Sequence, residues 1–207
     1  MNIAFDLDGT LIDSADAILA ALAAAFAACA VVPQQALSPR LIGPPLMTML
    51  ARLAGEHQAH ALPALAAAFK QHYDDSAYRQ TRVFAGVSEL LQALGQRGDT
   101  LFIATNKRIL PTRRIIDHLG WQAHFAATLA LDAFSPPLSD KAELLARLLQ
   151  LHGLQAGATL YVGDLHEDGL AARAAGMPFR LVSWGYGAAP SEWRSLASPQ
   201  DLLRELW

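Results

Sequence analysis

Two carboxylates stand together near the start of the chain. Asp6 and Asp8 follow an apolar run at residues 3–5 and precede Gly9, a pattern typical of a buried strand that ends in a tight turn. Two carboxylates this close cannot both ionise cheaply unless a cation lies between them or one keeps a proton. A pair with one ionised and one protonated carboxylate suits phosphoryl transfer. The ionised aspartate attacks phosphorus, and the other carries a proton to the leaving oxygen and later takes one from water.

A second acidic motif follows a later apolar run, at residues 159–162. It consists of Gly163, Asp164 and Asp168, and a third carboxylate at one site implies a hard divalent cation, with Mg²⁺ the candidate. A calcium loop of the EF-hand type is excluded, because positions 6 and 12 counted from Asp6 hold Leu11 and Ala17 instead of Gly and Glu. A plain Asp-Gly turn remains the alternative for the first motif taken alone.

Other polar residues with suitable chemistry are few. Lys141 begins a helical pattern after a proline-rich loop; a lone lysine is usually a solvated surface group, but an ammonium beside a phosphate would neutralise charge in the transition state. Thr105 and Asn106 end the apolar run at residues 100–104. They could donate to phosphate oxygens, or they could cap the helix that follows.

The elements that must position these residues alternate along the chain. Apolar strand patterns lie at residues 3–5, 100–104, 125–129, 159–162 and 179–184, and helical patterns lie at 87–97, 111–119, 141–152, 168–175 and 199–207. This alternation predicts an α/β fold, a Rossmann-like parallel sheet with helices on both faces. Ligands bind outside the carboxyl ends of such strands, where the three acidic and polar motifs would meet.

Residues 15–81 interrupt this alternation with helical patterns only. The sequence therefore predicts a core domain of residues 1–14 and 82–207 and an inserted α-helical domain of residues 15–81. Within the insertion, the segment from Arg40 to Pro45 contains Gly43 and two prolines, so it either faces a substrate or merely separates two helices. Arg40 could meet a second anionic group, although a solvated arginine is the common case.

Length and composition limit the class of protein. The chain has 207 residues, 53% of them hydrophobic, and a formal net charge of −3, which predicts a globular protein with no general attraction to nucleic acid or anionic lipid. The uncharged stretch at residues 17–32 is too short and too rich in alanine for a membrane span. The single cysteine, Cys29, favours a reducing compartment, so we expect a cytoplasmic protein.

Together these motifs resemble the haloacid dehalogenase superfamily in its phosphatase branch. The first motif, from Asp6 to Leu11, matches in full; Thr105 to Lys107 is similar to the second, Lys141 to the third, and Gly163 with Asp164 and Asp168 to the fourth. The resemblance covers essentially the whole chain, and the insertion lies where this branch carries a small helical cap. Within the branch, the chain looks most like phosphoglycolate phosphatases.

The resemblance implies roles for the acidic residues. Asp6 would be the nucleophile that forms an aspartyl-phosphate, and Asp8 would be the general acid and base. Asp6 and Asp164 would give carboxylate oxygens to Mg²⁺, Asp8 its backbone carbonyl, and Asp168 would act on the metal directly or through water.

The resemblance also implies how the substrate is bound. Thr105 and Lys141 would bind the phosphoryl group, Lys141 would also steady the nucleophile, and the backbone at Gly9 and the amide of Asn106 would help to hold phosphate. Gly43 would lie in the substrate-facing loop of the cap. The partner implied is a small phosphorylated metabolite, and the oligomeric state is left open.

Several functions remain open within the resemblance. The leading one is a Mg²⁺-dependent phosphomonoesterase acting on a phosphoglycolate-like metabolite; the alternatives are a phosphomutase of the β-phosphoglucomutase type and a phosphatase for a nucleoside monophosphate or a sugar phosphate. A true haloacid dehalogenase is disfavoured because that branch lacks the second aspartate, which Asp8 supplies here. The family usually has Ser where this chain has Leu165, which weakens the assignment to phosphoglycolate. The sequence assigns no role to Arg40, Lys107 or Arg108.

Overall fold

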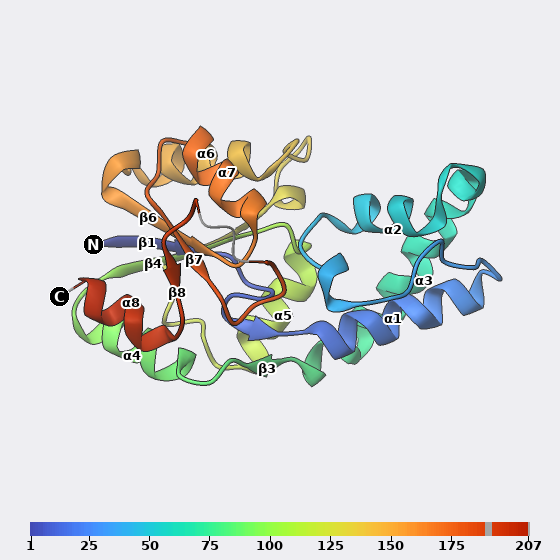
Figure 1. Cartoon of the computed structure of the whole chain (residues 1–207), viewed down its shortest axis with the longest axis horizontal. Helices are drawn as coiled ribbons and strands as arrows, with labels where there is room; N and C mark the ends of the chain where they lie inside the picture. Colours follow the sequence, from blue (N-terminus) through green and yellow to red (C-terminus); the bar gives the residue numbers. More distant parts are fainter. Residues whose placement is uncertain (189–191, 207) are drawn as a thin grey trace.

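The computed structural model describes residues 1–188 and 192–206 and is built on one parallel sheet (Figure 1). The strand order is β5-β4-β1-β6-β7-β8, and every neighbouring pair is parallel. The strands span β1 Asn2–Phe5, β4 Thr100–Thr105, β5 Ala127–Ala130, β6 Thr159–Gly163, β7 Phe179–Val182 and β8 Ser195–Leu196. Because β1 lies between β4 and β6, the polar motifs that follow these three strands are brought side by side.

Helices cover both faces of this sheet, as the alternating pattern predicted. The helices of the core span α4 Val87–Gln96, α5 Ile109–His118, α6 Lys141–His152, α7 His166–Ala174 and α8 Pro199–Leu206. The helices α6 and α7 pack on one face, and the other face packs against α4, α5 and α8 (Figure 1). The predicted α/β fold class is confirmed.

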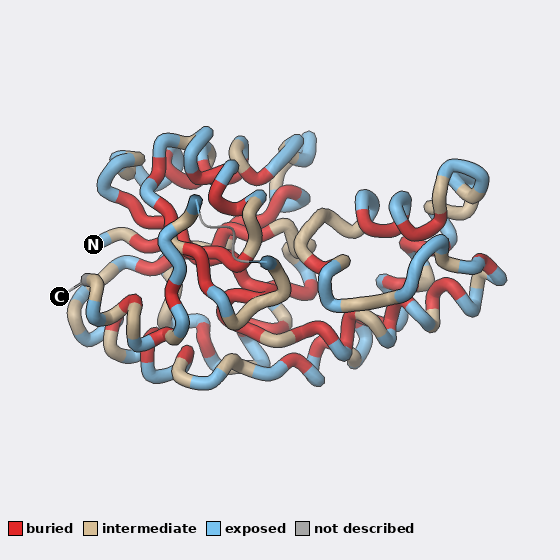
Figure 2. Tube along the Cα trace, viewed as in Figure 1, coloured by how far each residue is buried: buried red, intermediate tan, exposed pale blue. Residues whose placement is uncertain are grey.

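The side chains of the central strands divide between the two faces. Ile3 and Phe5 belong to the hydrophobic cluster shared with α4 and α5, whereas Ala4 belongs to the cluster shared with α6 and α7. All three are at most 1% exposed, and Figure 2 shows the sheet as the most continuously buried part of the core. A strand buried on both faces reads as a continuous apolar run rather than an alternating one.

Residues 15–81 form a helical segment beside this core. It contains α1 Ala15–Ala28, α2 Leu46–Ala54 and α3 Leu62–Asp75, with short 3-10 turns between them. Its helices pack on one another through large apolar side chains and project away from the sheet (Figure 1). A two-stranded antiparallel ribbon, β2 Ile12–Asp13 and β3 Arg82–Val83, carries the chain into and out of it.

Some element boundaries differ from the sequence prediction. The strands β2, β3 and β8 have two residues each and are too short to leave a period in the sequence. The strand predicted at 179–184 ends at Val182, and the helix predicted from residue 111 begins at Ile109. Trp207, included in the predicted last helix, lies outside the described residues.

No helix within residues 1–188 and 192–206 is long and apolar enough to cross a membrane. The uncharged stretch at residues 17–32 instead contributes most of α1, which packs on α3 through buried Leu22 and Phe26. Cys29 follows this helix, half-buried and unpaired.

Candidate active site

The first acidic motif lies directly beyond the end of β1. Asp6 is 3% exposed and Asp8 is 8% exposed, and the chain then turns sharply at Gly9, whose φ is +82°. A Cβ atom at Gly9 would stand 2.2 Å from a carboxylate oxygen of Asp164. This position therefore needs glycine for its backbone conformation and for its close approach to the second acidic motif.

Three aspartates from two strand ends meet at this point. Asp6, Asp164 and Asp168 each offer a carboxylate oxygen, and these three atoms lie within 4.8 Å of one another. Lys141, the first residue of α6, places its Nζ 2.5 Å from Oδ1 of Asp168 and 3.2 Å from Oδ1 of Asp6. The tertiary fold thus gathers residues that are up to 162 positions apart in the chain, from Asp6 to Asp168.

Burial governs the charges in this cluster. Loss of hydration raises the pKa of Asp6 to about 6, with Lys141 opposing that rise and Asp168 adding to it. Burial also raises the pKa of Asp164 to about 8, and repulsion from Asp168 and Asp6 contributes. Burial opposes the charge of Lys141, but attraction to Asp168 and Asp6 outweighs it and raises the pKa of Lys141 well above its ordinary value.

The cluster fits a hard divalent cation. One lysine cannot balance three carboxylates, and Oδ1 of Asp6, although ion-paired with Lys141, accepts no hydrogen bond from any residue that the structure describes. Both oxygens of Asp168 are engaged, since Oδ1 accepts from Lys141 and Oδ2 accepts from the backbone N–H of Leu165 at 3.1 Å. The oxygens of Asp164 accept from the hydroxyl of Thr10 at 3.4 Å and from the backbone N–H of Tyr186 at 2.8 Å. Oδ1 of Asp6 is therefore the oxygen of this cluster best placed for Mg²⁺, whose preferred ligands are carboxylates.

Asp8 points away from the three-aspartate cluster, toward the helical segment. Its Oδ1 accepts a hydrogen bond from Oγ of Ser14 at 2.5 Å, and Lys107 Nζ lies 3.0 and 3.1 Å from its two oxygens. The same ammonium donates to the hydroxyl of Tyr73 in α3, at 2.8 Å. The sequence left Lys107 without a role; its position directly after Thr105 and Asn106 was the available signal.

Thr105 and Asn106 lie at the end of β4, and neither caps the next helix. The residue that precedes the first turn of α5 is Arg108, and it makes no side-chain cap. Instead, the hydroxyl oxygen of Thr105 accepts from the backbone N–H of Lys107 at 3.2 Å, and the hydroxyl helps to lower the pKa of Asp6. The side-chain N–H of Asn106 donates to the backbone carbonyl of Gly43 at 2.9 Å, so the capping alternative is wrong.

The chain after β7 supplies contacts that the sequence analysis did not assign. The backbone N–H of Tyr186 donates to Oδ2 of Asp164 at 2.8 Å, and its hydroxyl donates to Oδ1 of Asp13 at 2.9 Å. Indole Nε1 of Trp184 donates to the backbone carbonyl of Thr10 at 3.0 Å. These side chains hold the turn after β1 against the second acidic motif.

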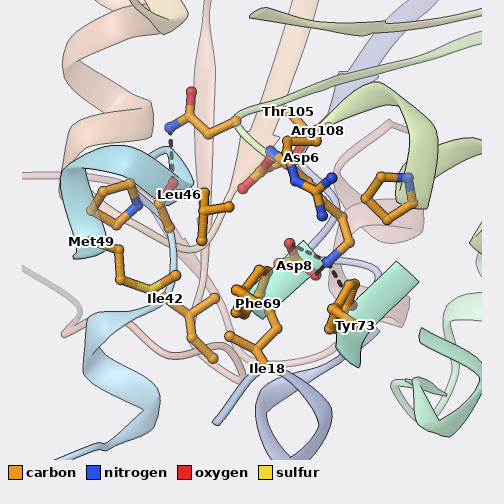
Figure 3. A pocket seen from close by; sticks show the side chains of 15 residues that line it. Asp6, Asp8, Ile18, Ile42, Leu46, Met49, Phe69, Tyr73, Thr105 and Arg108 are labelled. Atoms are coloured by element: carbon orange, nitrogen blue, oxygen red, sulfur yellow. Dashed lines mark hydrogen bonds and ion pairs between the residues drawn. The ribbon is translucent and has the colours of Figure 1, made fainter. Parts of the chain in front are cut away.

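A cavity of about 50 Å³ lies between this site and the helical segment (Figure 3). Asp6, Asp8 and Thr105 line its floor, and side chains of the helical segment, including Phe69 and Tyr73, close it from the other side. Gly43 also lines it, with a φ of +130° and its Cα against the side chain of Leu165. The predicted residues Asp6, Asp8, Gly43, Thr105 and Asn106 thus line this cavity. Lys141, Asp164 and Asp168 lie in the aspartate cluster beside it, where Gly9 approaches Asp164. Arg40 lines a neighbouring cleft instead.

Comparison with known proteins agrees with this arrangement. Residues 3–182 match the haloacid dehalogenase-like hydrolase family. The chain belongs to this family. The most similar curated relatives include a 5′-nucleotidase of Pseudomonas aeruginosa, 34% identical over 188 residues, which are 90% of this chain and 84% of the relative. A phosphoglycolate phosphatase of Xanthomonas campestris is 36% identical over 186 residues, 88% of this chain and 82% of the relative.

Solved structures of haloacid dehalogenase-like proteins share the fold over the whole chain. A hydrolase of this family from Streptococcus pneumoniae superposes with a TM-score of 0.85 at 24% identity and covers 100% of this chain and 98% of its own. The expected resemblance is therefore confirmed, and the chain is a phosphatase of the haloacid dehalogenase type.

Proposed function

We propose that this protein is a Mg²⁺-dependent phosphomonoesterase that works through an aspartyl-phosphate on Asp6. The observation that carries the proposal is the buried carboxylate of Asp6, which lies between the ammonium of Lys141 and the hydroxyl of Thr105 at the floor of the cavity. The substrate is a small phosphorylated metabolite, and neither nucleic acid nor a membrane takes part.

In the first step, the carboxylate of Asp6 attacks phosphorus and the bond between phosphorus and the ester oxygen breaks. The proton needed by the departing alcohol comes from Asp8, the general acid, two residues away on the same turn. Lys141 and Thr105 face the nucleophile, so they would hold the phosphoryl oxygens and offset their charge. Backbone N–H groups at Gly9 and the amide of Asn106 would add donors.

In the second step, water attacks the phosphorus of the aspartyl-phosphate, and Asp8 takes the proton of that water. The bond between Asp6 and phosphorus breaks, inorganic phosphate leaves, and both aspartates return to their starting state. Lys107 and Ser14 hold the carboxylate of Asp8 in place for both transfers.

A bound Mg²⁺ would neutralise the phosphate oxygens and allow Asp6 to attack an anionic group. Asp6 and Asp164 would hold it with their carboxylates and Asp8 with its backbone carbonyl. Asp168 would act beside it, since its oxygens already hold Lys141 and the turn before α7.

The helical segment would serve as a cap on the site, with residues 1–14 and 82–207 as the catalytic core. Its contacts with Lys107 and Arg108 hold it over the cavity. Partial exclusion of water would favour phosphoryl transfer over unproductive side reactions. The two-residue strands β2 and β3 are the connections about which it would move.

Relatives suggest two substrate classes without deciding between them. One is named for phosphoglycolate and another for 5′-nucleotides, and a sugar phosphate or the phosphomutase reaction remain alternatives. A mutase would return the phosphoryl group to a sugar phosphate, so net release of inorganic phosphate distinguishes the two reactions.

The decisive test is the Asp6→Asn variant. We expect p-nitrophenyl phosphate to be hydrolysed by the wild type with MgCl₂ and to be left intact, to within the detection limit, by the variant. Asp16→Asn, which changes an exposed aspartate of α1, is the matched control and should keep full activity. Magnesium-dependent hydrolysis that persists in Asp6→Asn would refute the assignment of the nucleophile.

A further inference from the structure

The cavity beside the nucleophile is apolar on the side that would receive the leaving group. Five of its lining residues from the helical segment are hydrophobic: Ile18, Ile42, Leu46, Met49 and Phe69. Figure 3 shows these side chains gathered opposite the carboxylates of Asp6 and Asp8. A departing alcohol would therefore meet hydrocarbon and one aromatic ring as it turns away from the phosphoryl site.

Two cations line the same cavity, and the first is fully engaged. An ammonium has three N–H donors, and Lys107 Nζ makes contacts of 3.0, 3.1 and 2.8 Å to the two oxygens of Asp8 and the hydroxyl of Tyr73. Its side chain is 6% exposed. Lys107 thus has no free donor for a second anion.

The second cation is paired as well. The guanidinium of Arg108 donates from two nitrogens to the two oxygens of Asp74, at 2.8 and 2.5 Å. Both side chains are largely buried, at 16% and 11% exposed, which makes this a bidentate pair of the strong kind. An incoming carboxylate would have to compete with Asp74 for the guanidinium of Arg108.

From this lining, and on the basis of the phosphatase function proposed above, we propose that the enzyme selects phosphate monoesters whose leaving alcohol is uncharged. A carboxylate or a second phosphate on the leaving group would be buried against hydrocarbon without a free cation, and an unpaired buried charge is strongly disfavoured.

A wider cleft provides the competing arrangement. It has a volume of about 500 Å³, shares Gly43 and Asn106 with the apolar cavity, and is lined by Arg40 and Arg52. Neither arginine forms an ion pair with a residue of the described part of the chain. A leaving group with a second anion would have to extend into this cleft, so the two arrangements predict opposite substrate preferences.

The test compares two esters of nearly equal shape. Phosphoglycolate carries a carboxylate where isobutyl phosphate carries an isopropyl group of similar shape, so charge is the main difference between them. We measure kcat/KM from phosphate release by the wild-type protein with MgCl₂, and p-nitrophenyl phosphate reports that the enzyme is active. We expect kcat/KM for isobutyl phosphate to be at least tenfold higher than for phosphoglycolate.

A charge placed in the cavity should change this preference. Leu46 begins α2 and faces the cavity (Figure 3); because it is only partly buried, a longer side chain can be accommodated. In Leu46→Lys we expect the ratio of phosphoglycolate to isobutyl phosphate turnover to rise at least tenfold. Leu46→Met, similar in length and uncharged, should leave the ratio within about twofold of the wild type.

Phosphoglycolate turnover equal to or faster than that of isobutyl phosphate in the wild type would overturn the inference. Loss of that turnover in Arg52→Gln would then assign the leaving group to the wider cleft. If the wild type and Arg52→Gln both still hydrolyse p-nitrophenyl phosphate, either of these results would leave the phosphatase proposal standing. If none of the three esters is hydrolysed, the phosphatase proposal itself fails.

Discussion

At the scale of single residues, this site consists of charged groups held where water is scarce. Asp6, Asp164 and Asp168 are at most 3% exposed, and among the described residues Lys141 is the one cation that forms an ion pair with this cluster. Buried carboxylates without enough neighbouring cations lower the stability of a fold. Here they are held in place by backbone segments that pack closely against them. The turn at Gly9 is the tightest of these approaches, because its Cα lies against Asp164.

Gly9→Ala should abolish activity because the new Cβ collides with Asp164, and a control variant can separate this effect from backbone strain. The new Cβ would stand 2.2 Å from Oδ2 of Asp164, and this would displace a carboxylate that the metal site needs. We expect kcat/KM for an aryl phosphate to fall at least a hundredfold.

Gly98→Ala is the matched control for that variant. Gly98 has a φ of +81°, nearly equal to that of Gly9, but its Cβ would meet nothing within 4 Å. Both variants should lose about 1 to 2 kcal/mol of stability from the positive φ, as measured by urea unfolding. Equal activity in the two variants would show that the approach to Asp164 is unimportant.

At the scale of elements, the site depends on how α3 of the helical segment contacts α5 of the core. Tyr73 and Asp74 lie at the end of α3, and they pair with Lys107 and Arg108 just before α5. Arg114, one turn into α5, also donates to the backbone carbonyl of Asp74. Two consecutive residues of the helical segment, Tyr73 and Asp74, thus contact two consecutive residues of the core, Lys107 and Arg108, at the edge of the cavity.

The Asp74–Arg108 pair should therefore contribute measurably to stability. In a double-mutant cycle with Asp74→Asn and Arg108→Gln, we expect a coupling energy of about 1 to 3 kcal/mol, as for contacting residues that are mostly shielded from water. The measurement is urea unfolding of the two single variants and the double variant. Arg113→Gln, which changes an exposed arginine of α5, should show no coupling to Asp74→Asn; a coupling near zero for the pair itself would contradict the prediction.

At the scale of the whole molecule, stability and metal binding should be linked through pH. The pKa values of Asp6 and Asp164 rise from 3.8 to about 6 and about 8 in the fold without a cation. Because each group then binds more protons folded than unfolded, the free energy of unfolding without metal falls as pH rises from about 4 to about 8. Mg²⁺ requires the ionised carboxylates, so its stabilising effect should grow over the same range.

Thermal unfolding with MgCl₂ or with EDTA checks this linkage. We expect the increase of Tm caused by Mg²⁺ to be larger at pH 8 than at pH 5.5. Asp164→Asn should lose most of that increase at both pH values, since it removes one of the carboxylates proposed to hold the ion. An increase of Tm that is the same at both pH values would argue against the aspartate cluster as the metal site.

Much of the fold followed from local pattern. The strands β1, β4 and β6 could be predicted because each is buried on both faces and is therefore a continuous apolar run, and α6 could be predicted from its leucines, from Asp140 as a cap and from Gly153 beyond its end. The two-residue strands could not, since their formation depends on partners distant in the chain. The candidate site likewise contains residues that the local pattern identifies and contacts that depend on partners distant in the chain.

The sequence by itself determined which residues would carry the proposed chemistry, because Asp6, Asp8, Asp164 and Thr105 each stand at the end of a recognisable strand, and parallel strands end at one edge of a sheet. Only the tertiary structure decided what surrounds them. The contact of Lys107 with Asp8 and Tyr73 and the apolar lining of the cavity join residues from separate helices, whose spacing along the chain carries no period. Those surroundings depend on how the helical segment packs against the core, and they determine the charge of the substrate that the site would accept.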